Sequence, residues 1–184
     1  MTNFVTQIGA STGSGSVVLA TSPTLVTPTL GAATATSVAF SPTTNGIIGT
    51  ATNDNASSTY VGEVISSAIV SASAVTATSN TATNVTTVSL TAGDWDVYGN
   101  ITWITLGTAP TSVAAWISSS NATTPDPSLY ARLVATGLTA DTGIATPTYR
   151  ASLSGTTTIY LSGLLSNTSG NGTACGNLFA RRRR

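Results

Sequence analysis

The stretch from Leu90 to Trp103 carries the most regular hydrophobic pattern of the chain. From Asp94 onward apolar and polar residues alternate, and Trp95, Val97, Ile101 and Trp103 share one face. Successive residues of a strand point to opposite faces, so this period of two predicts one long strand with an apolar face and a polar face. Because that apolar face carries two of the three Trp, we place it at the centre of a core between two sheets.

The pattern is typical of strands from residue 74 to residue 179, within a predicted sandwich domain at residues 74–184. Short apolar runs are separated there by Gly, Pro, Asn and Asp. Besides the central strand, the predicted strands are 75–79, 85–90, 112–118, 129–134, 147–153, 157–165 and 173–179. Ile159 and Leu161 fall on the inward face of their strand. Eight short strands at this spacing predict an all-β fold, an antiparallel β-sandwich of jelly-roll type.

A second set of apolar residues falls on the outward faces of these strands. The set is Tyr98, Ile104, Trp116, Tyr160 and Leu164. Scattered apolar residues on a surface carry no information, whereas a cluster of them marks an interface. If the five gather, they form either a contact between subunits or a ligand-facing surface, because aromatic side chains can also stack on sugars.

Residues 56–73 contain the one predicted helix, over 57–70. Val61, Ile65 and Ile69 are spaced by four, which places them on one helix stripe, and Ser57 or Ser58 can cap the start. Such a short helix is marginal alone. Its stripe therefore meets either symmetry copies of itself or its own sandwich.

Residues 1–55 are rich in Gly, Ser, Thr, Pro and Ala, with apolar residues spread thinly among them. Each Pro blocks a ladder donor and favours extended backbone before it. The apolar residues are too sparse for a separate core, so the segment is either disordered or folds against other chains. We favour an extended arm held by neighbouring subunits or by a partner surface.

Charge is scarce, at 7% of residues, and its formal sum is zero. Four of the six cations, Arg181, Arg182, Arg183 and Arg184, end the chain, while residues 1–180 are mildly acidic. This tail is a solvated end, a nucleic-acid contact, or a partner for acidic groups of a neighbouring subunit. Four Arg without a basic face are a weak nucleic-acid footprint, so we favour the contact with a neighbour.

Candidate chemistry is limited by composition. The chain has no His and no Lys, so a nucleophile lacks its usual bases. Asp94 and Asp96 share a strand face and can hold Ca²⁺ or hydrolyse a glycan. No third acidic ligand is near them, which favours a solvated strand start. We therefore expect no enzyme, no catalytic or metal site and no cofactor.

The chain also has few features that indicate a cellular compartment. Cys175 is the only Cys, so no disulfide forms within the chain. No apolar run approaches the roughly 20 residues that span a membrane. The N-terminus lacks the features of a signal peptide. We expect a protein made in the cytoplasm, without a membrane partner.

Three stretches resemble the fibre proteins of tailed bacteriophages, in the same order along the chain. They are GSGSVVLATSPTLVTPTLGAATATSVAF at 13–40, VGEVISSAI at 61–69 with NVTTVSLTAGDWDVYGNITW at 84–103, and the Arg-rich ending at 174–184. The resemblance covers about half the chain. It implies a homotrimeric, non-enzymatic virion appendage that contacts other virion proteins, with its arm fastened to the particle and its sandwich displayed outward. Fibres with this arm are often longer and carry a separate anchoring region. Because this arm starts at Met1, a head fibre or capsid decoration protein is expected as well as a tail fibre. The alternative reading is a module for host attachment that binds a surface glycan.

Overall fold

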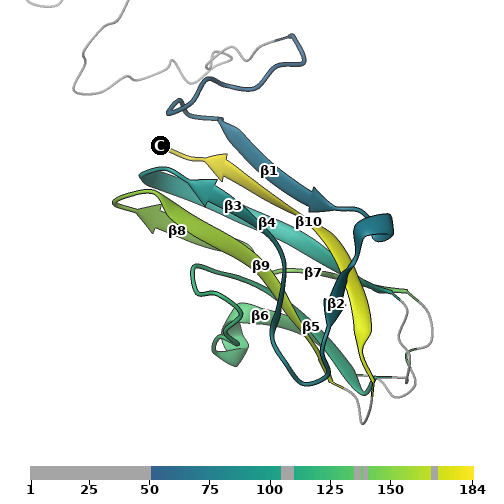
Figure 1. Cartoon of the computed structure of the whole chain (residues 1–184). Helices are drawn as coiled ribbons and strands as arrows, with labels where there is room; N and C mark the ends of the chain where they lie inside the picture. Colours follow the sequence, from purple (N-terminus) through teal and green to yellow (C-terminus); the bar gives the residue numbers. More distant parts are fainter. Residues whose placement is uncertain (1–50, 105–109, 135–137, 139–140, 167–169) are drawn as a thin grey trace, which may run out of the picture. The chain divides into compact units, whose positions relative to one another are not determined.

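A computed structural model describes residues 51–104, 110–134, 138, 141–166 and 170–184 (Figure 1). The predicted arm therefore lies outside the described residues, except for its last five. The described chain is an all-β sandwich, as predicted, with two single-turn helices, η2 (Ser71–Ser73) and η3 (Pro127–Leu129). Its strands are β1 (Val64–Ile69), β2 (Val75–Ala77), β3 (Thr83–Leu90), β4 (Gly93–Ile104), β5 (Ser112–Ser118), β6 (Tyr130–Val134), β7 (Thr142–Ala145), β8 (Tyr149–Leu153), β9 (Thr157–Ser166) and β10 (Gly172–Arg182).

The strands form two antiparallel sheets. Sheet A has the order β1-β10-β4, with β7 and β8 both pairing with the far side of β4, and β2 adding to β10. Sheet B has the order β3-β9-β5-β6. Most connections, such as those from β3 to β4 and from β4 to β5, cross from one sheet to the other. This strand order is that of a jelly roll.

The core lies between the two sheets. Trp95, Val97, Ile101 and Trp103 of β4 face Ile159 and Leu161 of β9, and none of these six side chains has exposed surface. Two strand glycines make room for this packing. A Cβ on Gly163 would lie 2.6 Å from Cζ2 of Trp103, and one on Gly99 would lie 3.3 Å from Cδ1 of Leu161. The apolar residues that alternate along β4 are thus closely packed in the interior.

The predicted helix over 57–70 is wrong. Val64–Ile69 is strand β1, which pairs with β10 from Val64 opposite Arg181 to Ile69 opposite Gly176. Figure 1 shows β1 running beside β10. Side chains of a strand alternate between its two faces, so residues spaced by four share one strand face. The same spacing also places residues on one helix stripe. Ile65 and Ile69 pack against the core, whereas Val61, which precedes the strand, is 69% exposed.

The end of β10 and the presence of β7 also differ from expectation. β10 continues through the first two tail arginines to Arg182, and β7 was not predicted at all. The tail pairs because β1 and β4 flank it on both sides, with Arg181 opposite Val64 and Asp96. A run of Arg has no strand pattern of its own, so the sequence alone does not predict that β10 continues into the tail.

Candidate functional site

The end of β10 builds a charged cluster at one edge of the sandwich. Arg182 Nε lies 2.8 Å from Glu63 Oε2, and both side chains are buried. The guanidinium also donates to the Ala92 carbonyl and the Thr91 hydroxyl, at 2.8 and 2.6 Å, and lies 4.2 Å from the ring centroid of Trp95. Burial raises the pKa of Glu63, but hydrogen bonds from Arg182 and from the Thr59 N–H outweigh it and hold that pKa below its ordinary value.

The two carboxylates considered for chemistry belong to the same cluster. Asp94 accepts two hydrogen bonds from Arg150, at 2.9 and 2.7 Å, and lies 3.2 Å from Arg184. The hydrogen bonds from Arg150 are the main reason that the pKa of Asp94 is lowered. Arg183 lies 3.4 Å from Asp96. A cavity of about 300 Å³ at this edge is lined by Asp94, Arg150, Arg183 and Arg184, whose charges already pair with one another or with Asp96.

This cluster changes the interpretation of the tail. Three of its four arginines contact Glu63, Asp94 and Asp96 of their own chain, so the tail has acidic partners within the chain. The expected pairing with a neighbouring subunit stays a prediction. The strand pairing of β10 delivers these side chains to the acidic residues. Arg181 alone of the four is exposed and without an ion pair among the described residues.

No group of three or more His, Cys, Asp or Glu that could hold a metal ion occurs in the described part of the chain. Nor does that part contain a helix long and apolar enough to cross a membrane. Cys175 is a free thiol, half-buried on β10. The Asn55 side chain holds the start of β1, because its amide N–H donates to the Val64 carbonyl and its amide oxygen accepts from the Val64 N–H, both at 2.8 Å.

The five outward residues do not form one patch, because the sandwich places them on opposite sides. Tyr98 and Ile104 lie on the outer face of sheet A, where the Tyr98 ring stacks on Phe179 with centroids 5.6 Å apart. Trp116, Tyr160 and Leu164 lie on the outer face of sheet B. The condition for one patch, that the five residues gather on one face, is therefore not met, and their role in a subunit contact or in ligand binding stays a prediction.

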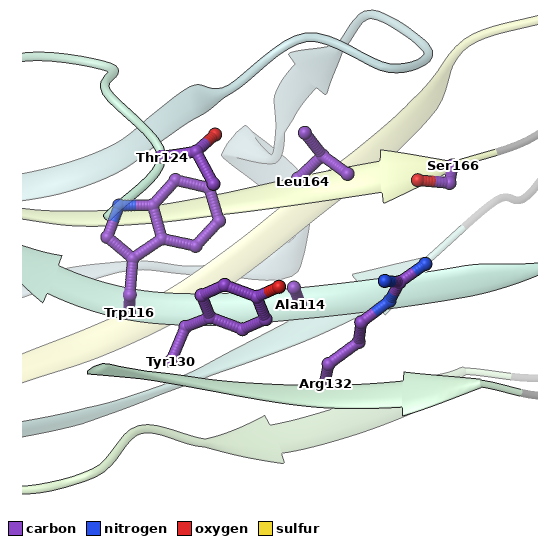
Figure 2. A pocket seen from close by; sticks show the side chains of 7 residues that line it. All are labelled: Ala114, Trp116, Thr124, Tyr130, Arg132, Leu164 and Ser166. Carbon is purple, nitrogen blue, oxygen red and sulfur yellow. The ribbon is translucent and has the colours of Figure 1, made fainter. Parts of the chain in front are cut away.

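Trp116 was expected to meet water, but it has no exposed surface. Thr124, from the loop at residues 119–126, lies beside the indole (Figure 2). Asn84 of β3 anchors this loop, accepting from the Ala122 N–H at 3.0 Å and donating to the side chain of Asn121. The indole Nε1 of Trp116 has no hydrogen-bond partner among the described residues. A loop bound to the outside of a sheet cannot be read from strand alternation.

Beside Trp116 the outer face of sheet B is hollowed into a pocket of about 140 Å³, here called the sheet B pocket. It is lined by Ala114, Trp116, Thr124, Tyr130, Arg132, Leu164 and Ser166. Figure 2 shows the two aromatic rings and Thr124 at one end, Arg132 and Ser166 at the other, and Leu164 and Ala114 between. The hollow arises because Ala114 is small and sits across the ladder from Leu164 on one side and Arg132 on the other.

The charged and polar members of this pocket were missed in the sequence. Tyr130 and Arg132 alternate on β6, which is a recognisable signal, but nothing local links them to Leu164 or Ser166. Arg132 donates to the Ser112 hydroxyl at 2.9 Å and has no ion pair among the described residues. It is the one charged side chain that lines the pocket.

No protein-family model matches this chain, and no curated protein matches it in sequence. Among solved structures, it is similar to the VP2 subviral particle of infectious bursal disease virus, with a TM-score of 0.44 and 14% identity. It is also similar to the structure of the Gx strain of that virus, with a TM-score of 0.41 and 14% identity. Each match covers 66% of this chain but 32% of the viral chain. Similarities this distant carry no functional argument.

Proposed function

We propose that this protein is a non-enzymatic structural component of a bacteriophage virion, a trimeric fibre or decoration protein of the head or tail. The observation that carries the proposal is the jelly-roll strand order of a chain that lacks His and Lys and has few charges. Viral capsid domains commonly have this architecture, although a fold alone never specifies a function. The resemblance of the sequence to phage fibres, carried by parts of β1, β3 and β4, supports the same role.

The outer face of sheet A is the surface that we assign to contacts between subunits. One row across it joins Ser66, Phe179 and Tyr98. The adjoining row joins Ala68, Asn177 and Asn100, so the middle of the face is free of charge. Such a surface can meet a neighbouring subunit without burying a charge, and its Ser and Asn side chains then need hydrogen bonds across the contact. In this proposal residues 1–55 fasten the trimer to the particle, and the opposite sheet is displayed.

The test has two parts that address the two halves of the proposal. Native mass spectrometry of the purified chain should give three times the monomer mass of 18.3 kDa. Peptide mass spectrometry of purified virions should find the protein, and deletion of its gene should remove it without stopping head or tail assembly. A monomer would contradict the trimer, and absence from virions would contradict the structural role.

A further inference from the structure

We propose that the sheet B pocket binds a sugar ring that carries a carboxylate. This goes beyond the structural role and does not depend on it, because the pocket lies within one chain. Three observations carry the proposal, namely an aromatic wall, an Arg without a carboxylate partner in the described part of the chain, and a volume suited to one small ring.

The aromatic wall is fixed in place. Trp116 and Tyr130 face each other across the β5–β6 ladder, with ring centroids 6.2 Å apart and planes tilted by 55°. The indole is completely buried. Neither ring needs to be ordered when a ligand enters, so the entropic cost of binding is low. Tyr130 and Leu164, which are half-buried, offer an apolar surface to the C–H face of a sugar ring, and the buried Trp116 ring packs against Tyr130.

Arg132 selects the charge of the ligand. Among the described residues, its guanidinium uses one N–H on the Ser112 hydroxyl, and its four other N–H donors have no partner in that part of the chain. A planar guanidinium fits a carboxylate with two parallel hydrogen bonds. The arginines of the C-terminal cluster contrast with it, because Arg150, Arg182 and Arg184 already contact carboxylates of the chain. Arg132 therefore faces the pocket as an available cation.

The remaining wall favours a ligand rich in hydroxyls. Thr124 and Ser166 line opposite ends of the hollow, and Tyr130 adds a phenol, so hydroxyl groups surround the apolar strip (Figure 2). The volume of about 140 Å³ is below the roughly 300 Å³ at which pockets for drug-sized molecules begin. One pyranose ring with a carboxylate matches this size and these donors, whereas an oligosaccharide would extend outside.

Binding is tested with the full-length protein labelled with ¹⁵N, by following the three indole N–H signals. Replacing each Trp by Phe in turn assigns them. D-glucuronate or N-acetylneuraminate should shift the Trp116 signal in a saturable way and leave the Trp95 signal in place, because Trp95 donates to the Thr91 carbonyl inside the core. Glucose and acetate, at the same concentrations, should not produce the shift.

Two variants and one control define the site. Ala114→Leu fills the hollow and should abolish the shift. Arg132→Gln should weaken binding about tenfold or more, as expected when a charge-assisted bidentate contact is lost. Arg181→Gln removes an exposed charge from the other sheet and should change nothing. The unaltered Trp95 signal verifies folding of each variant, and Arg132→Gln alone decides if Ala114→Leu does not fold.

Several results would overturn the proposal. The first is no response of the Trp116 signal to either acidic sugar. The second is an equal response to glucose, which would remove the role of Arg132. The third is an equal response to acetate, which would leave a simple carboxylate site such as a protein side chain would occupy. None of these results bears on assembly of the trimer or the virion, so the two proposals fail independently.

Discussion

Arg182 and Glu63 are 119 residues apart in the chain, yet Nε of one lies 2.8 Å from Oε2 of the other inside the protein. Their backbones are joined as well. The Arg182 N–H donates to the Glu63 carbonyl at 2.9 Å, and the Gly62 N–H donates to the Arg182 carbonyl at 3.1 Å. The end of the chain is thus bound to the segment just before β1, which closes the edge of sheet A.

Breaking this pair should cost more stability than any other single charge change in the described chain. Arg182→Met leaves Glu63 buried without its cation, so we expect a loss of about 3 kcal/mol or more in the free energy of unfolding. The double variant with Glu63→Gln should lose less than the sum of the two single losses. Chemical denaturation measures this cycle.

The exposed pair of Arg183 and Asp96 is the matched control. Their side chains are 54% and 39% exposed and 3.4 Å apart. Solvent screens such a pair, so Arg183→Met should leave the denaturation midpoint nearly unchanged. If Arg183→Met and Arg182→Met had equal effects, the buried pair would have no special role in closing the sheet.

Stability should fall in acid because of Glu63 and Asp94. Both carboxyl groups have a pKa below the ordinary values of 4.5 and 3.8. A lowered pKa in the folded state adds stability above the unfolded pKa, and this is lost as the pH falls through the folded pKa. The free energy of unfolding should therefore stay level from neutral pH to about 5 and decrease below the ordinary carboxyl range of about 4 to 4.5.

Denaturation curves of the wild type and of two variants check this pH dependence. Glu63→Gln and Asp94→Asn should each reduce the acid slope, at the expense of stability at neutral pH. An unchanged slope in both variants would assign the acid sensitivity to other groups, of which Asp126, whose pKa is also lowered, is the first to test.

The packing around Trp103 predicts an intolerant glycine. A Cβ on Gly163 would lie 2.6 Å from Trp103 Cζ2 and 2.6 Å from the Ala114 carbonyl oxygen. Neither the core indole nor the backbone of β5 can move aside cheaply, so Gly163→Ala should cost about 1–3 kcal/mol. Thermal denaturation of both variants measures this cost. Gly155→Ala, where a Cβ has no neighbour within 4 Å, should be close to neutral.

The proposed subunit contact predicts a separation of assembly from folding. Tyr98 is 48% exposed at the centre of the outer face of sheet A. Tyr98→Arg would place charge in that contact and should turn the trimer into folded monomers, as judged by native mass spectrometry and circular dichroism. Leu129→Arg, at a residue 52% exposed and remote from that face, should leave the trimer intact. A trimer unaffected by Tyr98→Arg would place the contact elsewhere.

The sequence by itself determined the elements whose two faces differ in polarity. β4 was predicted within three residues at its start and one at its end, and β5 at both ends, because alternation between apolar and polar residues is a local consequence of strand geometry. The core side chains of β4 and β9 followed from the same parity. The all-β sandwich followed from the number and spacing of such strands.

Only the tertiary structure decided features that depend on residues far apart in the chain. Residues 64–69 form a strand because β10 offers a free edge there, a choice that a spacing of four leaves open. Trp116 is buried on a face that alternation assigns to solvent, beside a loop that Asn84 binds at Ala122. The tail pairs with its own chain because β10 runs between β1 and β4. The sheet B pocket likewise combines β5, β6 and β9 with that loop, since a cavity is a property of side chains that only folding brings together.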